Sequence, residues 1–209
     1  MERPIKIFVE GIADIRFIEN YVDFLYGIKL AKNDIIGTKG WNNLINQQVS
    51  GQAYINQMNK NNDDGGVNLV IFDADTDTEN RRSEILQWKQ DNSLDFELFL
   101  FPNDKDTGAL EDLLEQIINS KNSSIFDCWN DYEVCLGGSK IEGRTEPLTT
   151  PAKKTKIYGY LEALLGKTRK EKDLIKEANR NYLNINHWNL SSEALNPLKD
   201  FLNKYFNDK

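Results

Sequence analysis

The sequence has little of what membrane-spanning, disulfide-bonded or histidine-based proteins depend on. Its two cysteines, Cys128 and Cys135, lack the spacing of a metal site and predict reduced thiols on a helix or in the core. His187 is the one histidine, which argues against a catalytic triad or a site of several histidines. No apolar run reaches the roughly 18 residues of a membrane span. We therefore expect a globular protein without a membrane partner.

Cationic residues are also in deficit. The 209 residues include 26 Lys and Arg against 33 Asp and Glu, a formal net charge of −7. That balance argues against a protein that coats nucleic acid non-specifically, although local basic patches or a bound metal can offset it. The first residues, MERPIKIFVEG, contain a short apolar run followed at once by an acid, unlike a signal peptide. A cytoplasmic location is expected.

Apolar runs alternate with helical patterns along the first half of the chain. We expect strands at Ile5–Val9, Ile35–Ile36, Val67–Phe72 and Phe96–Phe101, and a loop at Asn59–Gly66. We expect helices at Ile12–Tyr26, Trp41–Met58, Asp77–Gln90 and Gly108–Asn119, the second of them broken or weakened near Gly51. Helices between strands imply crossover connections and a mainly parallel sheet. The predicted fold class is α/β, with four mostly parallel strands flanked by helices.

The second half of the chain reads as helical. We expect helices at Ser123–Cys135, Pro151–Gly166 and Leu195–Phe206, with a flexible loop at Leu136–Pro151. Residues 1–120 are expected to form the α/β core. Residues 121–209 are expected to form a helical extension packed on that core, within a single structural unit.

Acidic residues gather where the predicted strands end. Glu10 follows the first strand, and Asp73, Asp75 and Asp77 follow the third. In open α/β sheets, ligands bind at the carboxyl ends of the strands. Carboxylates crowded together repel one another unless a cation lies between them, and Mg²⁺ prefers oxygen ligands. If the first and third strands are neighbours, these acids form a cup for one or two divalent ions.

Three further acids are candidates for the same site. Asp14 lies in the first turn of the helix after Glu10, and Glu111 and Asp112 begin the helix after the fourth strand. Acids in a first helical turn also cap the helix and suit its dipole, and for Asp77 we favour that interpretation.

The order and spacing of these motifs resemble a known domain. A strand ending VEGxxD and a later hydrophobic-DxD strand end are similar to the Toprim domain of topoisomerases, bacterial primases and overcoming-lysogenization-defect (OLD) nucleases. The chain most resembles small stand-alone prokaryotic proteins with a Toprim-like core, through FVEGIADIRFI, VIFDADTD, GALEDLL, KTKIYGYLEAL and LNPLKDFLNKYF.

The resemblance implies a Toprim-like sheet and a Mg²⁺ (or Mn²⁺) site. It implies that Glu10, Asp73 and Asp75 bind the metal and act in phosphoryl transfer on nucleic acid, with Asp77 as a further acid. The chain has no zinc-binding segment, helicase-like domain or topoisomerase tyrosine region. Metal-dependent phosphodiester cleavage, or a role beside a protein partner, is therefore expected rather than DNA relaxation or primer synthesis.

Other interpretations use the same acids. Asp73–Asp77 resembles the DxDxT motif of haloacid-dehalogenase-like phosphatases, but Asp77 replaces the final residue and the strand is not the first. An EF-hand loop would need Gly where Thr78 stands. A receiver domain would need a second acid beside Glu10. A non-enzymatic metal-binding accessory module is the remaining alternative.

Basic residues in the second half are candidate phosphate ligands. Lys140 and Arg144 lie in the predicted loop, where mobile surface charge is the alternative reading. Lys153, Lys154 and Lys156 lie at the start of a predicted helix, where positive charge opposes the helix dipole. That local conflict favours a function such as phosphate binding.

Overall fold

A four-stranded parallel sheet forms the centre of the molecule. In the computed structural model, which describes residues 3–45 and 49–206, the strands are β1 (Ile5–Val9), β2 (Ile35–Gly37), β3 (Val67–Asp73) and β4 (Glu97–Phe101). Their order across the sheet is β2-β1-β3-β4, and every pairing is parallel. The α/β prediction is confirmed, and the two strands that precede the main acids are neighbours.

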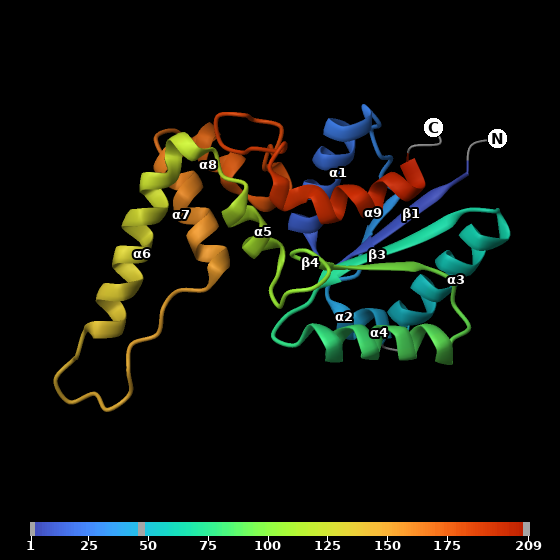
Figure 1. Ribbon diagram of the computed structural model, residues 1–209, viewed down its shortest axis with the longest axis horizontal. Coiled ribbons are helices and arrows are strands. Elements are labelled where there is room, and N and C mark those ends of the chain that lie inside the picture. The colour runs from blue at the N-terminus through green and yellow to red at the C-terminus, as the bar shows by residue number, and fades with distance from the viewer. Residues whose placement is uncertain (1–2, 46–48, 207–209) are drawn as a thin grey trace.

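Helices cover both faces of the sheet (Figure 1). One face carries α1 (Ile12–Tyr26), α5 (Leu110–Gln116) and α9 (Asn196–Phe206), and the other carries α2 (Trp41–Ile45), α3 (Val49–Asp63) and α4 (Thr78–Asp91). The strands supply both cores because alternate residues point to opposite faces. Ile7 and Ile71 belong to the first core, and Phe8 and Val70 to the second.

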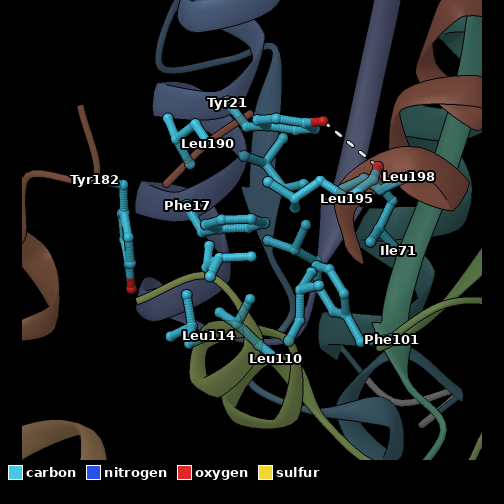
Figure 2. Packing of buried hydrophobic residues seen from close by; sticks show 14 of the residues in the cluster. Phe17, Tyr21, Ile71, Phe101, Leu110, Leu114, Tyr182, Leu190, Leu195 and Leu198 are labelled. Atoms are coloured by element: carbon cyan, nitrogen blue, oxygen red, sulfur yellow. Dashed lines mark hydrogen bonds between the residues drawn. The ribbon is translucent and has the colours of Figure 1, made fainter. Parts of the chain in front are cut away.

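The second half of the chain is built into the first of these cores. The Tyr182 ring lies edge-on to the ring of Phe17 in α1, with 5.3 Å between ring centroids, and packs on Trp188 with 5.2 Å between centroids. Figure 2 shows Tyr21, whose hydroxyl donates to the Leu195 carbonyl, among these side chains. Residues before and after position 120 therefore share one continuous hydrophobic cluster.

A helical hairpin extends away from the sheet. It consists of α6 (Ser123–Gly138), a loop, and α7 (Lys153–Leu165), followed by α8 (Arg169–Ile175) (Figure 1). Trp129 of α6 packs on Gly159 of α7, where an added Cβ would lie 2.6 Å from the indole. Cys128 and Cys135 are exposed free thiols on α6. No helix in the described ranges is long and apolar enough to cross a membrane.

Two of the predicted segments differ in the structure. The helix predicted at Trp41–Met58, with a break or weakening near Gly51, is two helices, α2 and α3; Gly51 lies within α3, and residues 46–48 lie outside the described ranges. The predicted loop Asn59–Gly66 is helical up to Asp63. Asn61 explains this, because its side-chain amide donates to the Val67 carbonyl and to Asn68. These contacts fasten the polar end of α3 to β3.

Five other predicted helices start or end at different residues, α4 and α7 by one or two residues at each end, and short 3₁₀ turns join the later helices. The predicted helix Gly108–Asn119 is shorter, because Gly108 has a φ of 139° and Ile118 pairs with Trp188. The predicted helix Ser123–Cys135 extends to Gly138, and α9 starts one residue later than expected. The turns are η1 (Ser120–Asn122), η2 (Glu177–Asn179) and η3 (Glu193–Leu195).

Candidate functional site

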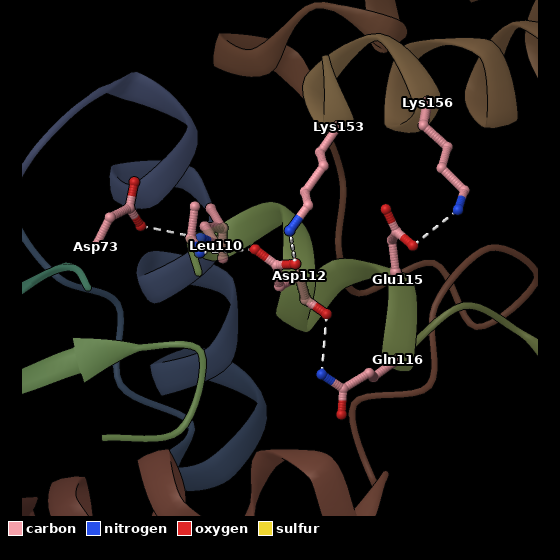
Figure 3. Close-up of polar contacts among 8 residues, drawn as sticks. Asp73, Leu110, Asp112, Glu115, Gln116, Lys153 and Lys156 are labelled. Carbon is pink, nitrogen blue, oxygen red and sulfur yellow. Dashed lines mark hydrogen bonds and ion pairs between the residues drawn. The ribbon is translucent and has the colours of Figure 1, made fainter. Parts of the chain in front are cut away.

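Glu10 and Asp73 lie side by side at the carboxyl ends of β1 and β3. Val9 pairs with Ile71, so Glu10 is level with the last residues of β3. The Asp73 backbone N–H donates to Glu10 Oε1 at 3.2 Å. Asp73 Oδ1 in turn accepts the Leu110 N–H at 2.9 Å, which links the end of β3 to the start of α5 (Figure 3). The sheet therefore brings these two predicted ligands together.

Asp14 joins this pair from the first turn of α1. Its Oδ2 accepts the Gly11 backbone N–H at 2.7 Å, a helix-capping contact, and the residue is 8% exposed. Burial, with further contributions from the negative charges of Glu10 and Glu111, raises the pKa of Asp14 to about 7. Asp14 therefore caps α1 and also interacts electrostatically with Glu10 and Glu111.

Asp73 is the most perturbed acid of the group. Burial, together with the charges of Asp14, Glu10 and Glu111, raises its pKa to about 9, while the Leu110 N–H opposes the change. Burial also raises the pKa of Glu10, against the opposing contact with the Asp73 N–H. Glu10, Asp14, Asp73 and Glu111 therefore form one electrostatically coupled group, which we call the acid cluster.

Asp75 lies beside the acid cluster but has a cationic partner of its own. Its backbone is in the left-handed region, at a φ of 55°, and pairs with Gly108 through hydrogen bonds in both directions, of 2.9 and 2.7 Å. Its carboxylate forms an ion pair with Arg81 of α4. Asp75 still raises the pKa of Glu10 through its charge, so it remains within electrostatic reach of the site.

The other two sequence candidates are helix caps. Asp77 accepts the Asn80 N–H at 3.0 Å and caps α4, as favoured from the sequence. Asp112 accepts the Ala109 N–H at 2.8 Å and forms an ion pair with Lys153 (Figure 3). Asp77 and Asp112 are therefore engaged in other contacts and are not part of the acid cluster. Glu111 is part of it, because its charge acts on Asp14 and Asp73.

A comparison with protein families covers almost the whole of this architecture. The model of a family described as protein of unknown function, DUF3226, matches residues 4–207. The chain belongs to the DUF3226 family. The match runs from the residue before β1 to the residue after α9, so it includes both the sheet and the helical half. No curated protein and no solved structure matches the chain.

The acid cluster of this DUF3226 protein has the donor chemistry of a hard-cation site. Within residues 3–45 and 49–206, no three Asp, Glu, His or Cys side chains are arranged to hold a metal ion. Glu10, Asp14 and Asp73 each accept a backbone N–H instead. Burial, with the neighbouring acids, raises the pKa values of these three carboxyls, and a divalent cation would favour their charged forms. Carboxylate oxygens are the donors that Mg²⁺ prefers, so Glu10 and Asp73 are the residues that would hold such a cation if one bound here.

The lysines predicted to bind phosphate have protein partners in this DUF3226 fold. Lys156 is buried, donates to Glu115 at 2.9 Å and to Asn130 at 3.0 Å, and lies over the Phe126 ring. Lys154 pairs with Glu177, and Lys153 pairs with Asp112. Phosphate binding by these three lysines therefore stays a prediction, and each of them already forms an ion pair with an acid distant in sequence. The pairs of Lys153 and Lys156 join α7 to α5 (Figure 3), and the pair of Lys154 joins α7 to η2.

Lys140 and Arg144 lie in the exposed loop between α6 and α7. Arg144 donates to the backbone carbonyls of Glu146 and Pro147 within the same loop. Neither residue is among the groups that perturb the acid cluster. His187, as expected, lies away from the acids, where burial lowers its pKa.

Two residues near the acids were missed from the sequence. Arg81 pairs with Asp75 and counteracts the rise in the pKa of Glu10. In the sequence, Arg81 is marked only by its position one helical turn after Asp77, the cap of α4. Tyr182 is fully buried, and Asp14 and Glu111 help to raise its pKa. No local pattern connects Tyr182 with residues more than 70 positions earlier.

Proposed function

We propose that this protein is a Mg²⁺-dependent phosphoryl-transfer enzyme that acts on nucleic acid, as a phosphodiesterase or nuclease of Toprim-like type. The observation that supports it is the meeting of Glu10 and Asp73 at the carboxyl ends of two adjacent parallel strands, with Asp14 and Glu111 beside them. Such a concentration of buried acids weakens folding and is typical of a functional site.

Each acid has a distinct place in the proposed chemistry. Glu10 and Asp73 would hold the cation, and Asp75 would join them if it left Arg81. A bound Mg²⁺ supplies polarisation of a phosphoryl oxygen and a more acidic bound water. Asp14, whose pKa is about 7, holds or releases a proton near neutral pH and is placed to serve as a proton reservoir beside Glu10. Arg81, whose charge acts on Glu10, would be the group to bind a phosphate.

One observation favours a second candidate, the non-enzymatic accessory module. The α6–α7 hairpin leaves Tyr132 and Val134 exposed, at 47% and 76%, and the α7 lysines are engaged internally. A protein partner on this hairpin would suit a regulatory role. No observation favours the haloacid-dehalogenase-like alternative, because Asp75, its required acid and base, pairs with Arg81.

Calorimetric titration with Mg²⁺ and Mn²⁺ tests the metal site. Binding should be lost in Asp73→Asn and Glu10→Gln, and retained in Asp77→Asn, whose asparagine preserves the α4 cap. Cleavage of single- and double-stranded DNA and RNA should follow the same pattern and stop with EDTA. Absence of cation binding by the wild-type protein would refute the metal site. Cation binding without cleavage would favour the accessory module.

A further inference from the structure

A cavity of about 640 Å³ lies between α2 and α4, on the sheet face opposite α1. This volume is in the range of small-molecule sites. Its lining includes Trp41 and Asn42 from α2, and Arg81, Gln87 and Trp88 from α4, with Asp91 at the end of α4. We call it the tryptophan cavity. It adjoins the acid cluster through one residue, because Arg81 both lines it and pairs with Asp75.

Two indole rings form the floor of the tryptophan cavity. Trp41 and Trp88 meet edge to face, at 5.8 Å between ring centroids and 83° between planes. Both are less than 10% exposed, so each presents only a part of its ring to the cavity. The exposed part of each ring offers aromatic contact to a planar ligand, and a full stacking contact contributes about 1–3 kcal/mol per base in single-stranded nucleic-acid complexes.

Two buried donors at the cavity have no acceptor in the described part of the chain. They are the indole Nε1–H of Trp88 and the Nε–H of Arg81. Buried donors are normally paired, and an unpaired one weakens folding. Both belong to residues that line the cavity, and both nitrogens are closed to solvent, so a ligand with hydrogen-bond acceptors would pair with them only after the two side chains turn toward the cavity.

The rim of the cavity favours a base over a phosphate. Asn42 and Gln87 are exposed amides, and Asp91, which accepts a hydrogen bond from Gln87 at 2.7 Å, is an exposed carboxylate. Amides and carboxylates match the donor and acceptor edges of nucleobases. Arg81 is the one cationic residue of the lining, and its guanidinium pairs with Asp75 on the side of the acid cluster and with Glu84 of the lining, at 3.7 Å.

We propose that the tryptophan cavity binds one unpaired nucleobase of a single-stranded nucleic acid, and that Arg81 directs the adjoining phosphate toward the acid cluster. This inference rests on the proposed function and narrows its substrate class. A base within a duplex is stacked and paired, so it has to leave the stack before it can enter such a cavity. Single strands are therefore preferred over duplexes.

Fluorescence anisotropy with two labelled oligonucleotides tests the proposal. One is a 12-nucleotide single strand of deoxyadenosines, and the other has the same backbone with tetrahydrofuran spacers in place of all bases. Titrations in EDTA exclude cleavage. The base-bearing strand should bind at least about tenfold more tightly than the base-free strand, as expected from stacking of one base.

Variants of exposed lining residues assign that preference to the cavity without disturbing the core. Asn42→Ala combined with Gln87→Ala should weaken binding of the base-bearing strand about three- to tenfold and leave the base-free strand unchanged. Gln90→Ala is the matched control, since Gln90 is an exposed residue of the same helix outside the lining. Equal binding of the two strands, failure to bind either, or a preference unaffected by the double variant would each overturn the proposal.

The Asp73→Asn variant separates this inference from the proposed function. It should retain the preference for the base-bearing strand in EDTA while it loses metal binding. If the wild-type protein binds no cation but prefers the base-bearing strand, and the cavity variants lose that preference, base binding is supported and the proposed enzyme is refuted. Metal-dependent cleavage of both oligonucleotides at equal rates, without a binding preference, would refute base binding and support the enzyme.

Discussion

Replacing Asp73 with asparagine is expected to stabilise the metal-free protein, and to do so increasingly as the pH rises. Burial and the neighbouring acids raise the pKa of Asp73 from 3.8 to about 9. The folded protein therefore keeps a proton that the unfolded chain releases above about pH 4. Between those two values, the wild-type free energy of unfolding falls by about 1.4 kcal/mol for each pH unit because of this one group.

Asparagine removes this pH dependence with little change in shape. Its side-chain oxygen can still accept the Leu110 N–H, but it does not titrate. Between pH 6 and pH 8, the advantage of Asp73→Asn over the wild type should grow by about 2–3 kcal/mol. Below pH 3.8 the advantage disappears, because both states of the wild type are then protonated.

Urea denaturation in EDTA, followed by circular dichroism at pH 6 and pH 8, measures this difference. Asp77→Asn is the control, because it changes an aspartate on the same segment that is not among the groups perturbing Asp73. Its difference from the wild type should be equal at the two pH values. If the advantage of Asp73→Asn is also equal at both, the raised pKa of Asp73 is refuted.

Two further predictions concern the lysine contacts and the metal. Lys156→Ala should lower the free energy of unfolding by about 2–4 kcal/mol, because it leaves Glu115 and Asn130 without their buried partner. Lys140→Ala, in the exposed loop, should change it by less than about 0.5 kcal/mol. Equal effects of the two variants in urea denaturation would contradict the structural role of Lys156. Mg²⁺ binding at pH 7.5 should release about one proton, because a metal ligand must be deprotonated. Calorimetry in two buffers of different ionisation enthalpy measures that release, and heats that do not depend on the buffer would contradict it.

The strands and the meeting of Glu10 with Asp73 followed from local sequence. Short apolar runs marked β1 and β3, and the parallel pairing of two strands necessarily brings the residues that follow them to the same edge. The helix Ile12–Tyr26 was predicted to the residue because its apolar spacing is regular and Gly27 ends it with a φ of 67°.

What the sequence could not show depends on partners distant along the chain. Lys153, Lys154 and Lys156 resembled free charge because their acidic partners lie 23 to 41 positions away. Asn59–Asp63 resembled a loop because Asn61 is stabilised in the helix by contacts with β3. Asp75 resembled an equal metal ligand because nothing local indicated that Arg81 would turn back to pair with it.

The backbone around the acid cluster is fastened at three points. Asp75 and Gly108 exchange two hydrogen bonds, Leu110 donates to Asp73, and the Gly40 N–H donates to the Glu10 carbonyl at 3.2 Å. The loops after β3 and β4 are thereby joined to each other, and the loop after β2 is joined to the end of β1. A cation that enters would reorient carboxylates on a fixed frame and would not have to order a loop. The entropic cost of binding the cation would then come from a few side-chain rotamers, as in a preorganised site.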